Sequence, residues 1–291
     1  MIDPRRLLAE PLPVIEQRIG WRDCILYALG LGVGLDPMDE ADLAFVDETR
    51  LKVQPTMANV MGYPGFWMRE PRFGLDWVKT VHGEHALRIH RPLPAEATVR
   101  GTSRIVGLVD KGADKGALIY VEREIVDVDR GELLATVRQT VFCRGDGGFG
   151  GAGAHPPPVE ATGPQAVPER PADDAVTLPT SAQSALVYRL SGDYNPLHSD
   201  PATARAAGFP RPILHGLATF GVVGHGLVKR LCGGRPEGLQ AMGGRFSSPV
   251  YPGEAVQLEL WRIGPGRAAF RASVPARGVV VMNNGFVEFT E

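Results

Sequence analysis

The chain has 291 residues, with 31 Lys or Arg and 33 Asp or Glu, so its formal net charge at pH 7 is -2. This balance gives no electrostatic reason to expect a nucleic acid or an anionic membrane as a partner. Hydrophobic residues make up 44% of the chain, as in typical globular proteins, and no apolar run is long enough to cross a bilayer. The length allows two domains of ordinary size.

The chain termini and the cysteines predict a cytoplasmic protein. The first residues lack the apolar core of a signal peptide, and the last three, Phe-Thr-Glu, are not a peroxisomal address. Cys24, Cys143 and Cys232 are far apart and odd in number, which favours reduced thiols. The His and Cys residues show no metal-ligand spacing, so we expect neither a metal nor a redox cofactor.

In the N-terminal half, the apolar segments 117–128 and 132–143 flank Asp129-Arg130-Gly131. This pattern predicts two strands joined as a hairpin. The stretch 61–76 contains several Gly and Pro residues, so no long helix is expected there. Two interpretations remain open for the large side chains of this region, which either line a space for an acyl chain or fill a core. They are Phe66, Trp67, Met68 and Trp77.

A change in composition indicates a boundary in the middle of the chain. Almost half of the residues from Gly145 to Pro171 are Gly or Pro, which neither a helix nor a strand tolerates. We therefore predict an N-terminal half at 1–150, a linker at 151–171 and a C-terminal half at 172–291.

The two halves resemble each other faintly. Leu26-Tyr27-Ala28-Leu29 corresponds to Val187-Tyr188-Arg189-Leu190, and 92–96 corresponds to 249–254 with one residue inserted. Strand-like segments also end the second half, at 268–274 and 279–289. We interpret the chain as two copies of one fold that form an internal pseudo-dimer.

The densest group of polar residues is the D-x-N-P-x-H motif of the C-terminal half, with Asp193, Asn195 and His198. Pro196 disfavours a helical conformation for the preceding residue, so the motif forms a turn in which Asp193 and His198 can converge. A carboxylate and a histidine can activate a water molecule, and an amide can orient it. The alternative is that Asp193 and Asn195 only cap the helix expected to begin near Asp200.

His215-Gly216 begins the apolar run 217–231, which predicts a buried helix. The backbone N–H of Gly216 would point outward at the positive end of that helix. Such an N–H can stabilise negative charge that develops on a carbonyl oxygen. The alternative is an ordinary helix start at a glycine.

The segments YRLSGDYNPLHSDP and GFPRPILHGLATFG resemble the hydratase motif of the MaoC-like, or type 2 (R-specific), enoyl-CoA hydratases. Looser similarity extends over most of the chain, including DCILYALGLG, PTMANVMG and RFSSPVYPGEAVQLELW. The resemblance implies an α+β double hot-dog fold with two curved antiparallel sheets. A long central helix would be wrapped in the C-terminal half, and its counterpart in the N-terminal half would be degenerate.

The resemblance also implies the roles of individual residues. Asp193 and His198 would form the catalytic dyad, Asn195 would assist them, and the Gly216 N–H would form the oxyanion hole. The N-terminal half has Gly30-Leu31-Gly32-Val33 in place of the acidic motif, so it would hold acyl chain and CoA without catalysing. The residues expected to contact substrate or CoA are His82, Gly83, Lys111, Gly148, Phe149, Gly150, His215 and Arg245.

These observations predict reversible hydration of a trans-2-enoyl-CoA to a (3R)-3-hydroxyacyl-CoA, with CoA thioester as substrate and a homodimer as the assembly. Three alternatives remain open. One is a dehydratase that acts on another carrier or a specialised acyl group. Another is a non-catalytic acyl-thioester-binding module, and the third is a thioesterase, because the hot-dog fold serves that activity too.

Overall fold

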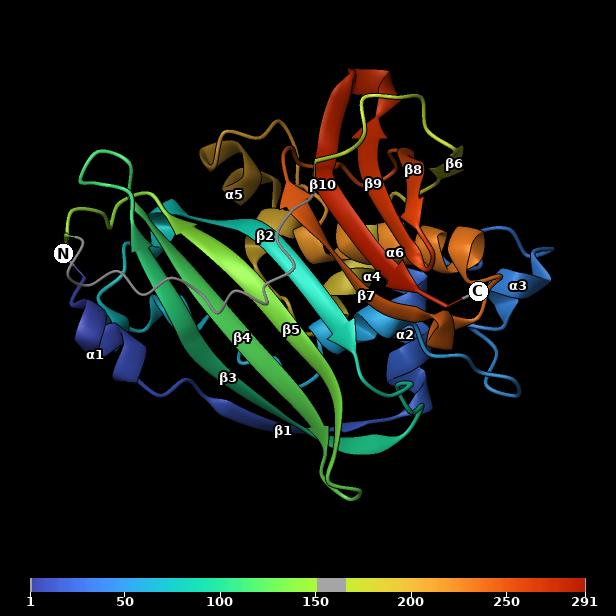
Figure 1. The fold of residues 1–291 in the computed structure, drawn as a ribbon, viewed down its shortest axis with the longest axis horizontal. Helices are drawn as coiled ribbons and strands as arrows, with labels where there is room; N and C mark the ends of the chain where they lie inside the picture. Colours follow the sequence, from blue (N-terminus) through green and yellow to red (C-terminus); the bar gives the residue numbers. More distant parts are fainter. Residues whose placement is uncertain (1, 151–165, 291) are drawn as a thin grey trace.

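The structure is a computed structural model that describes residues 2–150 and 166–290. Its strands form one ten-stranded sheet in the order β1-β3-β4-β5-β2-β7-β10-β9-β8-β6 (Figure 1). Neighbouring strands pair antiparallel throughout. The strands are β1 (Val14–Ile19), β2 (Thr80–Ile89), β3 (Ala97–Asp110), β4 (Ala117–Asp127), β5 (Glu132–Cys143), β6 (Asp174–Leu178), β7 (Leu239–Phe246), β8 (Val256–Gly264), β9 (Arg267–Val274) and β10 (Val279–Phe289).

The strand order confirms that the chain contains two copies of one fold. The first five strands occur in the order 1-3-4-5-2, and the last five repeat this order in reverse from the other side of the β2–β7 junction. At the junction, Glu84 of β2 lies opposite Arg245 and Arg88 lies opposite Ala241. The limits 1–150 and 172–291 stay predictions, and most of the expected linker 151–171 lies outside the described residues.

The helices are short except for one. α6 has 16 residues and is apolar on nearly all sides, which is typical of a fully buried helix. It packs against β6, β7 and β8 and lies across one face of the C-terminal strands (Figure 1). The α-helices are α1 (Pro4–Ala9), α2 (Trp21–Gly30), α3 (Glu40–Leu43), α4 (Ser184–Tyr188), α5 (Pro201–Ala206) and α6 (Gly216–Leu231). None of the described helices is long and apolar enough to cross a membrane.

The N-terminal half has no long helix at 61–76, as predicted. This stretch forms only two short 3-10 helices, η2 (Trp67–Arg69) and η3 (Pro71–Phe73). A third short helix, η1 (Pro55–Asn59), is fully buried between the halves, where it contacts α6, β2 and β5.

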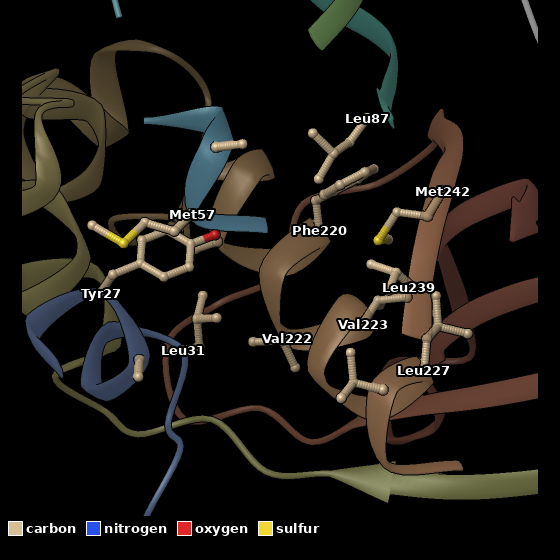
Figure 2. Packing of buried hydrophobic residues seen from close by; sticks show 14 of the residues in the cluster. Tyr27, Leu31, Met57, Leu87, Phe220, Val222, Val223, Leu227, Leu239 and Met242 are labelled. Atoms are coloured by element: carbon tan, nitrogen blue, oxygen red, sulfur yellow. The ribbon is translucent and has the colours of Figure 1, made fainter. Parts of the chain in front are cut away.

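The main hydrophobic core is therefore shared by both halves (Figure 2). Side chains of α2, η1 and β2 meet side chains of α6 and β7 in one cluster. The labelled members are Tyr27, Leu31, Met57, Leu87, Phe220, Val222, Val223, Leu227, Leu239 and Met242.

The predicted hairpins are present. β4 and β5 pair from Ala117 opposite Cys143 to Asp127 opposite Glu132. At the turn, the Asp127 carboxylate accepts hydrogen bonds from the backbone N–H groups of Asp129 and Arg130. Gly131 takes a φ of 67°, a conformation that glycine adopts without strain. The strands predicted at 268–274 and 279–289 correspond to β9 and β10.

The four large side chains of the N-terminal half divide between core and surface. Trp67 and Met68 are buried in a second hydrophobic cluster, built on α1, β3, β4 and β5. Phe66 and Trp77 are exposed and pack edge to face, with ring centroids 6.0 Å apart. Trp67 also lines a cavity, which is described below.

Candidate active site

The D-x-N-P-x-H motif forms a turn between α4 and α5, as the sequence predicts. Pro196 starts a three-residue 3-10 helix, η7 (Pro196–His198). The Asn195 side chain caps it by accepting a hydrogen bond from the Leu197 N–H at 3.1 Å. The Asp193 carboxylate accepts from the Asn195 N–H at 3.2 Å. α5 is capped by Asp200 instead, so the Asp193 side chain is not needed as a cap for that helix.

His198 is buried, with 8% of its surface exposed. Its Nδ1–H donates a hydrogen bond to the backbone carbonyl of Ile213 at 2.9 Å. Burial lowers the pKa of His198, although the Ile213 carbonyl and the Asp193 carboxylate act in the opposite direction. A neutral ring that donates from Nδ1 carries its lone pair on Nε2, so His198 can accept a proton there.

His215 lies directly against His198. The two rings stack with centroids 3.7 Å apart and planes 27° apart. The His215 Nε2–H donates to the backbone carbonyl of Asp193 at 3.1 Å, and its Nδ1 has no partner among the described residues. Burial, followed by the nearby His198, lowers the pKa of His215 to about 3, so the ring is neutral at neutral pH.

Asp193, His198 and His215 form one compact group. Their potential proton-accepting or ligating atoms lie within 4.8 Å of one another, and Asp193 remains partly open to solvent. Within residues 2–150 and 166–290, this is the one group of three or more His, Cys, Asp or Glu residues with metal-ligand proximity. Each imidazole already uses one nitrogen on a backbone carbonyl, which leaves one lone pair on each ring for chemistry.

Gly216 is the first residue of α6 and follows directly on His215. It is exposed, and the N–H groups of a first helical turn have no partner within the helix. A Cβ atom at Gly216 would lie 3.6 Å from the Phe246 ring, which is an ordinary contact. The glycine is therefore not required by packing, and its N–H is available beside the Asp193–His198–His215 group.

The predicted substrate contacts fall into two places. His82 lies near the α6 start, because its ring packs on Phe246 with centroids 5.0 Å apart. Gly83 forms a bulge in β2 directly after His82. Burial lowers the pKa of His82 to about 4. Arg245, on the neighbouring strand β7, is exposed.

The second place is the far end of the β3–β4 hairpin. The Asp110 carboxylate accepts hydrogen bonds from the N–H groups of Gly148 and Gly150, so it joins this glycine loop to the loop that contains Lys111. Phe149 of the glycine loop packs on the second hydrophobic cluster. A surface pocket of about 560 Å³ is lined by Lys111, Asp114, Lys115, Phe142 and Arg144. Its three cations suit phosphate groups, but no described hydrogen bond or ring contact connects it to Asp193 or His198.

Two residues near Asp193 were not predicted from the sequence, Tyr63 and Arg123. Burial, followed by the charge of Asp193, raises the pKa of Tyr63 to about 12, so this phenol lies near the Asp193 carboxylate. Arg123 lies within 6 Å of the Tyr63 ring centre, at 5.4 Å. In β4, Arg123 lies two residues from both Val121 and Ile125, so it points to the same face of the strand as these two buried residues. That period of two was a readable signal of an inward-facing arginine.

Comparison with known proteins supports the resemblance over the whole chain. The profile of the MaoC like domain matches residues 164–284, and that of the MFE-2 hydratase 2 N-terminal domain matches residues 19–145. A 3-hydroxyacyl-thioester dehydratase Y of Mycobacterium tuberculosis (strain ATCC 25618 / H37Rv) is 39% identical, with 99% of this chain and 98% of the relative covered. A peroxisomal enoyl-CoA hydratase 2 of Arabidopsis thaliana is 37% identical, over 97% of this chain and 94% of the relative.

Solved structures agree with these sequence relatives. A MaoC-like dehydratase from Phytophthora capsici superposes with a TM-score of 0.86 at 32% identity, and the match covers 100% of this chain and 99% of that chain. A Mycobacterium tuberculosis protein described as having a double hot-dog fold matches with a TM-score of 0.57 at 16% identity, which supports the fold alone. With a continuous double hot-dog sheet and relatives of this identity along its full length, the chain belongs to the MaoC-like hydratase and dehydratase family and is a hydro-lyase.

Proposed function

We propose that the protein catalyses the reversible hydration of a trans-2-enoyl-CoA to a (3R)-3-hydroxyacyl-CoA, with Asp193 and His198 as its acid–base dyad. The observation that carries this proposal is the position of His198. Its Nδ1–H is held by the Ile213 carbonyl, so the Nε2 lone pair is free within a group that also contains Asp193. The relatives named enoyl-CoA hydratase and 3-hydroxyacyl-thioester dehydratase correspond to the two directions of such a reaction.

The reaction follows from these groups. His198 and Asp193 hold one water molecule, and one of them takes a proton from it while its oxygen attacks C3 of the enoyl thioester. The electron pair of the C2–C3 double bond moves to the thioester carbonyl, where the Gly216 N–H at the α6 start stabilises the negative oxygen. A proton from the dyad then goes to C2, so one water adds across the double bond and the dyad returns to its first state.

The remaining parts of the site serve to bind and position the substrate. Asn195 holds the turn of the motif together through its bond to Leu197, which keeps Asp193 beside His198. We propose that His82, Gly83 and His215 surround the thioester. Lys111, Arg245 and the loop of Gly148, Phe149 and Gly150 would contact the CoA portion. The proposed reaction uses no redox cofactor, because addition of water across an enoyl thioester changes no net oxidation state. We expect no metal either, because Asp193 and His198 can supply the acid and the base themselves.

The test is the loss of enoyl-thioester absorbance with crotonyl-CoA and trans-2-decenoyl-CoA, with chiral analysis of the product. We expect the 3R product, and we expect Asp193→Asn and His198→Gln each to lower kcat by about 10² to 10⁴, the usual contribution of a positioned acid or base. Circular dichroism of both variants shows whether they are folded. Undiminished kcat in a folded variant would remove that residue from the mechanism.

Two other activities of the same site give different results in this assay. A dehydratase for another carrier would turn over carrier-protein thioesters faster than CoA thioesters. A binding module would bind acyl-CoA with no turnover at any chain length, and a thioesterase would release free thiol.

We also propose that the protein forms a homodimer in the cytoplasm. Light scattering of the purified chain measures its mass in solution, and 31.3 kDa, the mass of one chain, would contradict the dimer. The location stays a prediction from the sequence, since the Arabidopsis thaliana relative is named as peroxisomal.

A further inference from the structure

A small cavity lies in the N-terminal half beside the candidate active site. The space in which the centre of a water molecule can lie is about 20 Å³. This is room for one water molecule or one polar group of similar size. Leu217, the residue after Gly216, forms one wall, and Tyr63, whose pKa is raised in part by Asp193, forms another. The cavity therefore adjoins the point where the substrate carbonyl is expected.

The wall of this cavity combines apolar and polar side chains. Ligand pockets are mostly apolar, with a few placed polar groups. Here more than half of the lining residues carry a polar side-chain atom. These polar residues are Asn59, Tyr63, Trp67, His85, Ser103, Arg123 and Gln139.

Arg123 is the charged member of the wall, and only 6% of its surface is exposed. Its Nη2 donates to the backbone carbonyls of Ala58 at 3.3 Å and Asn59 at 2.6 Å. Among the described residues it has no carboxylate partner, and its Nε–H is buried without any partner. Burial lowers the pKa of Arg123 to about 10, so the side chain is still a cation at neutral pH.

Asn59 supplies a second unpaired donor. Its Oδ1 accepts from His85 Nε2 at 2.8 Å, while its Nδ2 is buried and has no partner among the described residues. Buried donors without a partner are rare in native proteins, because leaving one unpaired costs about 1–3 kcal/mol. Both residues line one cavity, and one of them is a buried cation without a carboxylate partner among the described residues. Such a cation beside a cavity indicates a ligand atom that accepts hydrogen bonds.

We propose that this cavity receives an acceptor oxygen carried by the acyl chain of the substrate, as a carboxylate or a ketone, and that Arg123 selects for it. The inference rests on the proposed function, because it names the class of acyl group for that site. An alkyl chain would leave the buried charge of Arg123 without a polar or anionic partner in the cavity, whereas an oxygen there would offset it. Sites built to hydrogen-bond a substrate group discriminate strongly against analogues that lack it.

Binding of saturated acyl-CoA thioesters, which cannot be hydrated, tests this proposal by calorimetry. Hexanoyl-CoA is compared with adipoyl-CoA and 5-oxohexanoyl-CoA, and octanoyl-CoA with suberoyl-CoA and 7-oxooctanoyl-CoA. We expect an oxygen-bearing chain to bind at least about tenfold more tightly than the plain chain at one length. The adipoyl and oxo-acyl arms show whether a carboxylate or a ketone is preferred. Equal affinities at every length would overturn the proposal and leave the cavity to an ordered water.

Arg123→Met is the variant that should remove the preference, with Arg100→Met as its matched control. Arg100 lies on the adjacent strand β3, is exposed and pairs with Glu16. We expect Arg123→Met to bring the affinity ratio of oxygen-bearing to plain chains close to one, and Arg100→Met to leave it unchanged. A purely structural role for Arg123 would weaken both ligands by the same factor and keep the ratio, and that result would contradict the proposal.

Gln139→Leu is the second variant, in case Arg123→Met does not fold. Gln139 lines the same cavity from β5, and its side chain forms no described hydrogen bond. We expect it to lower the preference for the oxygen-bearing chain by about threefold or more. Hydration of crotonyl-CoA is assayed separately. Turnover without a binding preference contradicts this inference alone, and a preference without turnover contradicts the proposed function alone.

Discussion

His198 and His215 stack face to face, with ring centroids 3.7 Å apart, while each donates its N–H to a different backbone carbonyl. A proton added to one ring places a positive charge against the other, and this repulsion contributes to the lowered pKa of His215. Burial lowers the pKa of both rings, and the contact adds to this for His215, so both are neutral at neutral pH. The neutral state is the one in which His198 can act as a base.

The burial of His215 against His198 predicts that acid destabilises the protein. Because the pKa of His215 is about 3 in the folded state and near 6.5 when unfolded, the unfolded chain binds more protons between these values. The contribution of His215 to the free energy of unfolding is complete above pH 6.5. It is lost as the pH falls towards 3, by about 1.4 kcal/mol per pH unit. Urea unfolding at pH 7, 6 and 5 measures the effect.

His215→Gln should reduce the proton uptake on unfolding by about one proton, so the free energy of unfolding changes less steeply with pH. His90→Gln is the control, because His90 is an exposed histidine on the surface. An unchanged slope in His215→Gln would show that His215 is not the group that titrates. A similar change in both variants would contradict the assignment as well.

Gly216 allows the oxyanion proposal to be tested through the backbone. Gly216→Pro removes the N–H, and proline is well tolerated at the first position of a helix. The preceding residue, His215, already has a ψ of 138°, as proline requires of its neighbour. We expect kcat for crotonyl-CoA to fall by about 10² to 10³, the usual cost of one lost oxyanion donor.

Gly216→Ala is the matched control for this prediction. It keeps the N–H, and its Cβ meets Phe246 at an ordinary contact distance. We expect kcat to stay within about threefold of the parent. A normal kcat in folded Gly216→Pro would exclude this N–H from catalysis.

A buried ionic network should stabilise α6 away from the site. Burial acts to raise the pKa of Asp42, but hydrogen bonds from His225 and Lys229 lower it to about 2. Gln54 also donates to the other ring nitrogen of His225. Asp42→Ala leaves the Nε2–H of His225 without a partner, while Lys229 keeps its ion pair with Asp39, so we expect the free energy of unfolding to fall by about 2 kcal/mol.

Asp174→Ala is the control, because Asp174 pairs with Arg230 of the same helix at the surface. We expect it to cost less than about 1 kcal/mol. Chemical denaturation of both variants gives the comparison. Equal losses would show that the Asp42 network contributes no more than an ordinary surface pair.

The pseudo-symmetric helices α2 and α4 meet at Gly30. A Cβ atom there would lie 2.9 Å from the Cα of Tyr188, whose ring also contacts Tyr27 at 5.7 Å between centroids. Gly30→Ala must push the two helices apart, and overpacking of this kind costs about 1–3 kcal/mol. Thermal unfolding tests it against Gly20→Ala, where the added Cβ meets only Asp23 at 3.7 Å. A smaller loss of thermal stability in Gly30→Ala than in Gly20→Ala would contradict the close contact between the two helices.

Local features of the structure were predictable because they depend on neighbours in sequence. Pro196 predicted the turn at Asp193 to His198, and the apolar run after His215 predicted α6, which begins at Gly216. The β4–β5 hairpin followed from two apolar segments around a turn that ends at Gly131. The roles of the dyad came from the family resemblance, and they stay predictions.

The sequence by itself therefore determined the fold family, the halves and the residues able to do acid–base chemistry. Only the tertiary structure decided that His198 and His215 stack, and that Arg123 of β4 meets the carbonyl of Asn59. Periodicity shows which side of a strand is buried, but not which distant backbone group lies opposite it. That depends on the register of the sheet and on where α6 and η1 pack, and so do the unpaired donors around the cavity.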